Sequence, residues 1–126
     1  MSTKIFAFST LAQGDKSGIN SPLLTAITKK SDWKALWKQH DRMDPANPAP
    51  EVDFRKTMVI AVFIGPRSSR GYGVTIESVE EKEKEITVTY RCTGSAGTNC
   101  AMSQPHHLVK VAASQKKVNF VSAAPA

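Results

Sequence analysis

A series of short, strand-like segments separated by turns limits the possible folds of this chain more than any other feature. Within these segments, apolar residues either alternate with polar ones or form brief unbroken runs, which is typical of β-strands. Strands joined by short turns predict a mainly β (α+β) fold, a compact antiparallel sandwich or barrel of about six to eight strands. The segments lie at residues 5–9, 23–28, 58–64, 72–76, 86–92, 108–111 and 118–121.

Two of the predicted strands show which of their faces should be buried. The segment 58–64 is apolar at every position, which predicts a central strand covered on both faces. In the segment 86–92 the apolar residues fall on alternate positions, so one face should point inward and the other toward water. Between the strands 72–76 and 86–92, the charged residues 80–85 predict a solvated turn.

One helix is predicted at residues 31–40, packed against the sheet. Ser31 or Asp32 is a suitable N-cap, and Trp33, Leu36 and Trp37 are spaced to form one apolar stripe. The two tryptophans could instead form a platform for a ligand, but their helical spacing favours the core.

The length and composition predict one domain, residues 1–126, with a frayed tail at 122–126. No apolar run approaches the ~20 residues that cross a bilayer, so we expect no membrane span. The first eight residues hold no long apolar segment, and we expect no signal peptide there. The net charge of +6 raises nucleic acid as a partner, but the basic residues are dispersed and no nucleic-acid module signature is present. A nucleic-acid binder is therefore a minor alternative.

The connector at residues 65–72 carries side chains that are common at protein-binding sites. Arginine and tyrosine are favoured at the energetic centres of protein interfaces. The alternative is an ordinary polar hairpin loop whose tyrosine packs inward. The candidate partner-binding residues are Arg67, Ser68, Ser69, Arg70 and Tyr72.

A second connector leads into the strand at 108–111 and adds the candidates Gln104, Pro105, His106 and His107. Proline restricts the preceding residue to an extended shape. Either histidine could make partner binding depend on pH. The alternative is a turn at a strand edge, with one histidine buried and the other exposed.

The two cysteines, Cys92 and Cys100, bracket a short loop and are a candidate disulfide. A pair of cysteines suits an oxidising compartment, whereas the alternative is two free, half-buried thiols. Zinc is disfavoured, because the remaining soft ligands are His40 and two adjacent histidines that should point to opposite faces of a strand. We therefore expect neither a metal nor another cofactor.

No catalytic centre is predicted. Cys100 could act as a nucleophile with His106 or His107 as its base, but no signature of a cysteine protease surrounds it. The chain also lacks a nucleophile elbow, a phosphate-binding loop and a dinucleotide-binding glycine motif. We expect no catalytic residue and no enzyme activity, and a small enzyme is a minor alternative.

Taken together, these segments resemble the PrcB C-terminal domain family, with a likeness that spans about residues 20–121. The family takes its name from an accessory subunit of a bacterial cell-surface protease complex. The resemblance implies a non-catalytic partner-binding domain, with a protease as one possible partner and a periplasmic, envelope or secreted location. The residues that carry it are the helix Ser31-Asp32-Trp33-x-x-Leu36-Trp37, then Pro50-Glu51-Val52-Asp53-Phe54, then Gly65-x-Arg67-x-x-x-Gly71-Tyr72-x-Val74-x-Ile76, and finally Gln104-Pro105-x-His107-Leu108-Val109.

The order of the loops is also similar to that of chagasin-type cysteine-protease inhibitors, which present three loops from one end of a β-sandwich. Here the corresponding steps are Arg70-Gly71-Tyr72, the loop 93–99, and Gln104-Pro105-His106. The diagnostic residues differ, because His106 stands where those inhibitors have an aromatic residue. Because the loop order is shared, direct inhibition of a peptidase is the alternative to docking without inhibition.

Overall fold

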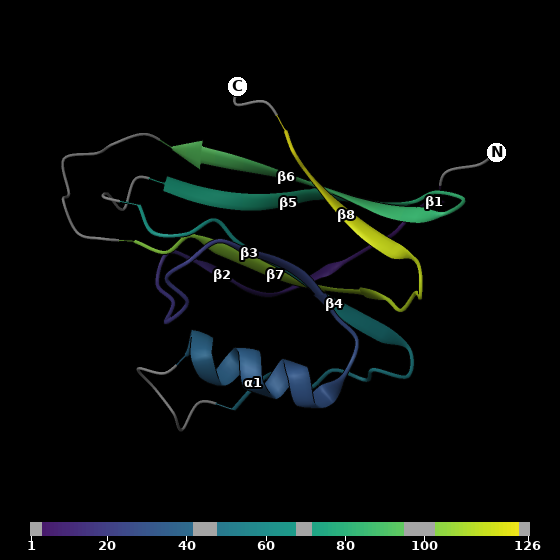
Figure 1. Ribbon diagram of the computed structural model, residues 1–126, viewed down its shortest axis with the longest axis horizontal. Helices are drawn as coiled ribbons and strands as arrows, with labels where there is room; N and C mark the ends of the chain where they lie inside the picture. Colours follow the sequence, from purple (N-terminus) through teal and green to yellow (C-terminus); the bar gives the residue numbers. More distant parts are fainter. Residues whose placement is uncertain (1–3, 42–47, 68–71, 95–102, 124–126) are drawn as a thin grey trace.

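Two four-stranded sheets and one helix form three layers in the computed structural model, which describes residues 4–41, 48–67, 72–94 and 103–123 (Figure 1). One sheet has the strand order β1-β5-β6-β8 and the other β2-β7-β4-β3, and the helix covers the outer face of the second sheet. In chain order the elements are β1 (Lys4–Ile5), β2 (Ser9–Gly14), β3 (Leu23–Ile27), α1 (Lys30–His40), β4 (Thr57–Phe63), β5 (Tyr72–Glu81), β6 (Glu85–Gly94), β7 (His106–Ala112) and β8 (Lys117–Ser122).

The two sheets keep open edges, so the fold is a β sandwich with one helix and not a closed barrel. The β6–β8 pair is parallel, whereas the other paired strands that the structure describes are antiparallel. The parallel pair arises because the connector 113–116 carries the chain from β7 in one sheet to β8 in the other. The consecutive strands β7 and β8 therefore do not pair with each other as a hairpin.

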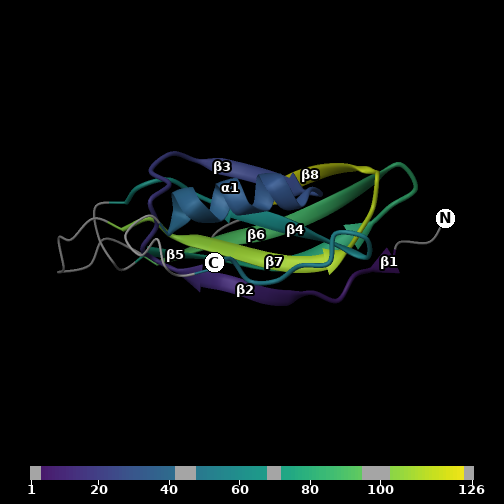
Figure 2. The same cartoon turned by 90° about the horizontal axis from the view of Figure 1, so that it is seen from below.

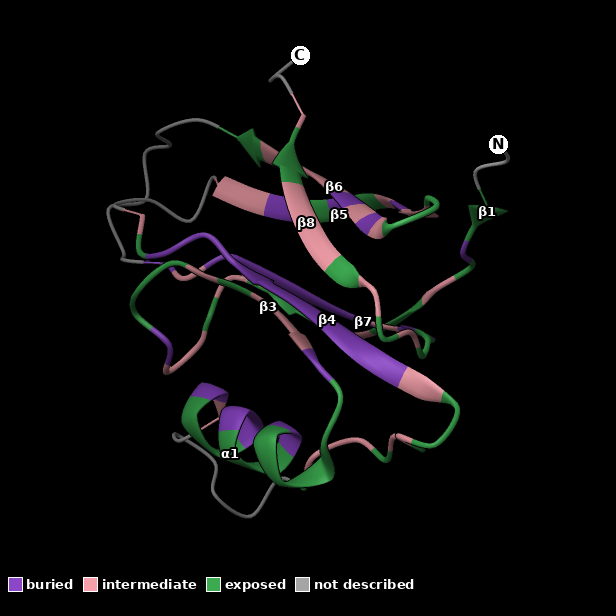
Figure 3. Cartoon of the chain, turned by 45° about the vertical axis from the view of Figure 1, so that its right-hand side comes forward, coloured by how far each residue is buried: buried purple, intermediate pink, exposed green. Residues whose placement is uncertain are grey.

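The core on either side of β4 confirms that this strand is covered on both faces (Figure 3). Met58, Ile60 and Val62 point between the sheets, where they pack with apolar residues of β5, β6 and β7. Val59, Ala61 and Phe63 point to the other side, where the helix covers them. An antiparallel β7 lies beside β4 over its full length, and β7 is likewise almost entirely buried.

Helix α1 packs its predicted stripe on the sheet. Trp33, Leu36 and Trp37 are all buried, and the Trp33 indole N–H donates to the carbonyl oxygen of Pro50 at 2.9 Å. The predicted N-cap, however, is wrong. The helix begins at Lys30, and its N-cap residue Lys29 makes no capping hydrogen bond through its side chain. Because the Trp33 amide already donates to the Lys29 carbonyl, the first turn starts before Ser31.

Two other segments differ from the sequence-based prediction. The predicted strand 5–9 is divided, since β1 pairs with β5 in one sheet while β2 pairs with β7 in the other. The charged turn predicted at 80–85 shortens to 82–84, because β5 and β6 extend as a ribbon whose charged side chains remain in contact with water. A bond from the Lys82 amide to the Glu85 carbonyl closes that turn.

Among the described residues, no helix has both the length and the apolar character that crossing a membrane requires.

Candidate partner-binding site

The two connectors that carry the candidate residues meet at one end of the sandwich. Phe63, the last residue of β4, is the partner of His106, the first residue of β7. Tyr72, the first residue of β5, is the partner of Gly94, the last of β6. Figures 1 and 2 show these strand ends together on the left, with the end of β2 beside them. We call this region the loop end.

Backbone hydrogen bonds tie the connectors of the loop end to one another. Arg67 and Ser103 exchange two bonds, of 2.8 and 2.9 Å, as an isolated antiparallel bridge. The Gln104 amide donates to the Asp15 carbonyl at 2.7 Å, which joins the connector after β2 to the other two. Three segments that are far apart in the sequence are thus held in a fixed arrangement.

Arg67 is partly committed to this arrangement through its own side chain. The guanidinium donates to the carbonyl oxygens of Ile64 and Pro66, both at 3.1 Å. The side chain therefore stabilises the turn after β4 and is only partly available to a partner. The other candidates of this connector, Ser68, Ser69 and Arg70, lie outside the described residues.

The half-buried Tyr72 borders a hollow of about 320 Å³ at the loop end. The exposed side chain of Gln13 crosses one side of it, and its amide donates to the Val74 carbonyl at 3.0 Å and to the Thr75 hydroxyl at 3.2 Å. The contribution of Gln13 could not be predicted from the sequence, because a short polar segment does not show which strand it will face. The residues that line the hollow are Gln13, Gly14, Asp15, Tyr72, Gly73, Val74, Thr75 and Thr93.

The second connector contributes less surface than predicted. Pro105, His106 and His107 are all buried, whereas Gln104 is half-buried. The arrangement with one buried and one exposed histidine is wrong, because strand β7 is covered on both of its faces. In this structure neither imidazole is available for direct contact with a partner.

His107 instead connects the two sheets. Its Nδ1 accepts the backbone N–H of Ile76 on β5 at 2.9 Å, and its Nε2 lies 2.8 Å from the Thr10 hydroxyl. Because a backbone amide can only donate, Nδ1 carries no proton and the neutral ring holds its hydrogen on Nε2. Burial lowers the pKa of His107, and the neighbouring His106 lowers it further. Both effects keep the imidazole neutral, as the bond to Ile76 requires.

His106 points the opposite way, as expected for adjacent residues of a strand, and meets His40 from the end of α1. The ring centroids lie 4.5 Å apart, and His40 Nδ1 lies 2.7 Å from the Ser17 hydroxyl. His106 Nδ1 donates to the Gln104 carbonyl at 2.9 Å. Phe63 packs against both imidazole rings.

This histidine pair is held neutral. Burial, reinforced by the proximity of His106, lowers the pKa of His40 from 6.5 to about 4, against a smaller opposing effect of Asp41. Burial also lowers the pKa of His106, although the Gln104 carbonyl acts in the opposite direction. Ser17 and Gln104 belong to connectors of the loop end, so their hydrogen bonds join the histidine pair to those connectors.

The predicted disulfide is not confirmed. Cys92 is a free, half-buried thiol on the inner face of β6, and Cys100 lies outside the described residues. Within the described ranges, no three His, Cys, Asp or Glu side chains are grouped as a metal would require.

Comparison with protein families gives a match in the central part of the chain. The family model described as PrcB C-terminal matches residues 58–112, a narrower range than the likeness inferred from the sequence motifs. The match includes β4, β5, β6 and β7, and with them both connectors of the loop end. Comparisons with curated proteins and with solved structures give no match. The match over residues 58–112 supports the resemblance of this chain to the PrcB C-terminal family.

Proposed function

We propose that this chain is a non-catalytic protein-binding module that docks on a partner through the loop end. One observation carries the proposal: connectors from three parts of the sequence meet at a single end of the sandwich and are hydrogen-bonded to one another. A stiff scaffold that holds polar loops in place lowers the entropy lost on binding, which favours recognition.

The family supports a protein as the partner. The match to the PrcB C-terminal family model suggests an accessory domain, and the resemblance implies a protease or another envelope protein as the target. The chemistry of the histidines supports a non-catalytic role. His107 bridges the sheets, and His40 and His106 are held neutral beneath the loops, so all three serve the scaffold.

Direct inhibition of a peptidase is the second candidate. It is favoured by the shared position of the two connectors, whose order is similar to that of the chagasin-type loops. His106, however, occupies the aromatic position of the third loop and is 4% exposed, so it cannot enter a cleft without rearrangement. Assays with purified papain-like and subtilisin-like peptidases separate the two functions, because a docking module leaves their activity unchanged at micromolar concentration.

The two tyrosines of the chain offer a matched test of docking. Both are half-buried in the same sheet, but Tyr72 begins β5 at the loop end while Tyr90 lies within β6 and packs on the core. We expect Tyr72→Ser to weaken capture of the partner from the source organism's envelope fraction by about 30-fold, the loss of one interface hot spot. Tyr90→Ser should lower the melting temperature and leave capture by the folded protein unchanged.

Quantitative mass spectrometry of the captured proteins gives the result, with circular dichroism of each variant as the folding control. Equal recovery of the same protein by the wild type and both folded variants would show that the loop end is not the docking surface.

A further inference from the structure

Strand β8 is an edge strand that lacks most of the usual protection against pairing with another chain. Natural sheets block their edges with very short strands, bulges, proline or covering segments. Strand β1 has two residues, and β2 contains a bulge between Thr10 and Ala12. Strand β8 has six residues and neither of these devices, and its one charged residue, Lys117, stands at its first position. Among the described strands it pairs with β6 alone, and Val121 is 47% exposed. Its outer edge is therefore available for a further strand.

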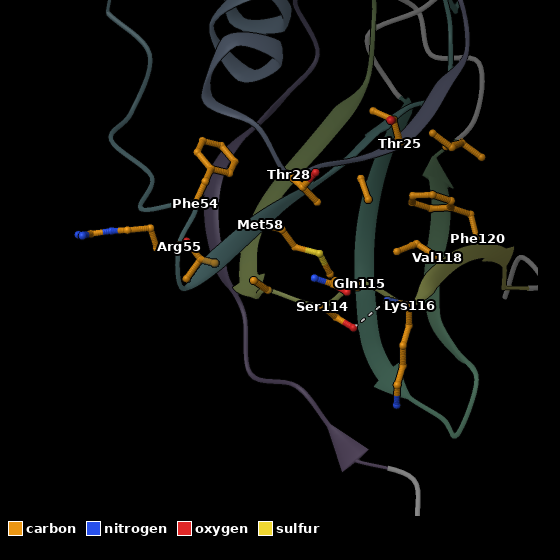
Figure 4. Close-up of a pocket in the computed structure, with 14 residues that line it drawn as sticks. Thr25, Thr28, Phe54, Arg55, Met58, Ser114, Gln115, Lys116, Val118 and Phe120 are labelled. Atoms are coloured by element: carbon orange, nitrogen blue, oxygen red, sulfur yellow. Dashed lines mark hydrogen bonds between the residues drawn. The ribbon is translucent and has the colours of Figure 1, made fainter.

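A groove of about 700 Å³ lies beside that edge, between β8 and the edge strand β3 of the other sheet. Figure 4 shows Val118 and Phe120 of β8 on one side of it, Phe54 and Arg55 on the other, and Met58 between them. The volume is within the range of about 300–1,000 Å³ that is usual for ligand sites. The half-buried side chains of Phe54, Val118 and Phe120 thus give the groove apolar patches among its polar lining, next to the unpaired backbone edge of β8.

The charge of the groove indicates what it would accept. Among the described residues that line it, Arg55 and Lys116 are charged and none is acidic. Arg55 pairs with Asp53 at 3.1 Å, and because this pair is exposed it is weak and can be exchanged for a carboxylate of a partner. Lys116 lies 3.5 Å from Glu81 and donates to the Lys82 carbonyl at 2.8 Å, so its half-buried side chain is more firmly held and adds a fixed positive charge to the rim. The apolar patches and the two cations together favour an acidic ligand that carries some apolar side chains.

We propose that the β8 edge and this groove bind an extended segment of a partner polypeptide, which adds as a strand alongside β8. Main-chain hydrogen bonds would supply part of the affinity, and alternate apolar side chains would enter the groove. Carboxylates near the ends of the segment would meet Arg55 and Lys116. A second copy of this chain is disfavoured as the occupant, because two copies would each carry a charge of +6.

This proposal goes beyond docking through the loop end, and it does not depend on it. The groove is formed by residues at the opposite ends of β4 and β7 from the loop end, around Thr57 and Ala113. The effects of substitutions in the groove and at Tyr72 on partner binding can therefore be measured separately.

Selection from a phage library of random octapeptides tests the proposal. Wild-type protein should enrich peptides with Asp or Glu near the ends, alternating apolar residues in the centre, and no proline. We expect a synthetic copy of the enriched peptide to bind the Arg55→Glu, Lys116→Glu double variant at least about tenfold more weakly by fluorescence anisotropy. The matched control is the double variant Lys34→Glu, Lys38→Glu, which makes the same charge change on the exposed face of α1. It should bind like the wild type.

Amide hydrogen exchange then locates the peptide, and bound peptide should protect amides of residues 117–122 selectively. The proposal is overturned if no peptide is enriched, if the groove and control variants bind equally, or if protection falls outside β8 and β3. It is also overturned if the wild type forms a dimer that the peptide dissociates, because a second copy would then occupy the edge.

Discussion

Replacing His107 with leucine should destabilise the sandwich by about 2 kcal/mol. Leucine has a similar size, so the principal change is loss of the acceptor for the buried Ile76 N–H, which His107 Nδ1 receives at 2.9 Å. A buried donor without a partner costs about 1–3 kcal/mol. The imidazole is 3% exposed, so water cannot readily replace it. For a chain of this length, the loss lowers the melting temperature by roughly 8 °C.

Asparagine at the same position is the matched control. Its side-chain oxygen can occupy the place of Nδ1, so His107→Asn should keep the bond to Ile76 and lose less stability than His107→Leu. Urea unfolding of both variants at pH 7.5, where the wild-type imidazole is neutral, gives the free energies. A leucine variant as stable as the wild type would refute the view that this histidine is held in place by the need to satisfy a buried amide.

Three further predictions concern other parts of the scaffold. Burial lowers the pKa of His40 to about 4, so the unfolded chain binds a proton at this residue before the folded protein does as the pH falls. Urea unfolding should therefore show full stability above pH 6.5 and a loss of about 2 kcal/mol by pH 4, after allowance for solvent screening. A His40→Asn variant should lose less stability over that range. Trp33→Phe should cost about 1 kcal/mol in the same assay, since it keeps the ring against the sheet and removes the bond to the Pro50 carbonyl; an unchanged unfolding midpoint would contradict this. Gly65→Ala should lower the melting temperature by at least about 4 °C, because Gly65 has a φ of +87° and an added Cβ would lie 3.0 Å from the Pro22 ring. An unchanged melting temperature would mean that the turn relaxes freely.

The buried face of an element could be predicted from the sequence wherever the spacing of its hydrophobic residues alone determines it. The unbroken apolar run of β4 and the stripe of Trp33, Leu36 and Trp37 were both correctly assigned, since each residue's face follows from its position in one element. The sheet to which a strand belongs was not predictable in the same way. Nothing within β8 shows that it pairs in parallel with β6, because that depends on where the connector 113–116 leads.

The same distinction holds for the site. Positions 65–72 and 104–107 could be predicted to gather at one end, since antiparallel strands bring alternate connectors together. The roles of the histidines could not. The partner of His107 on β5 is 31 positions away, and the contact of His40 with His106 requires the helix to be docked on the sheet. His106 and His107, which were predicted as contacts for a partner, are buried side chains that support the loop end.

Site-specific photocrosslinking tests the central claim, that the loop end is the protein-binding surface, most directly. A photoreactive phenylalanine analogue is placed at Tyr72 in one protein and at Lys34, on the exposed face of α1, in another. Both are irradiated in the envelope fraction of the source organism. A discrete crosslinked protein from position 72 alone is the predicted result. Crosslinks of equal yield to the same protein from both positions, or from position 34 alone, would contradict it.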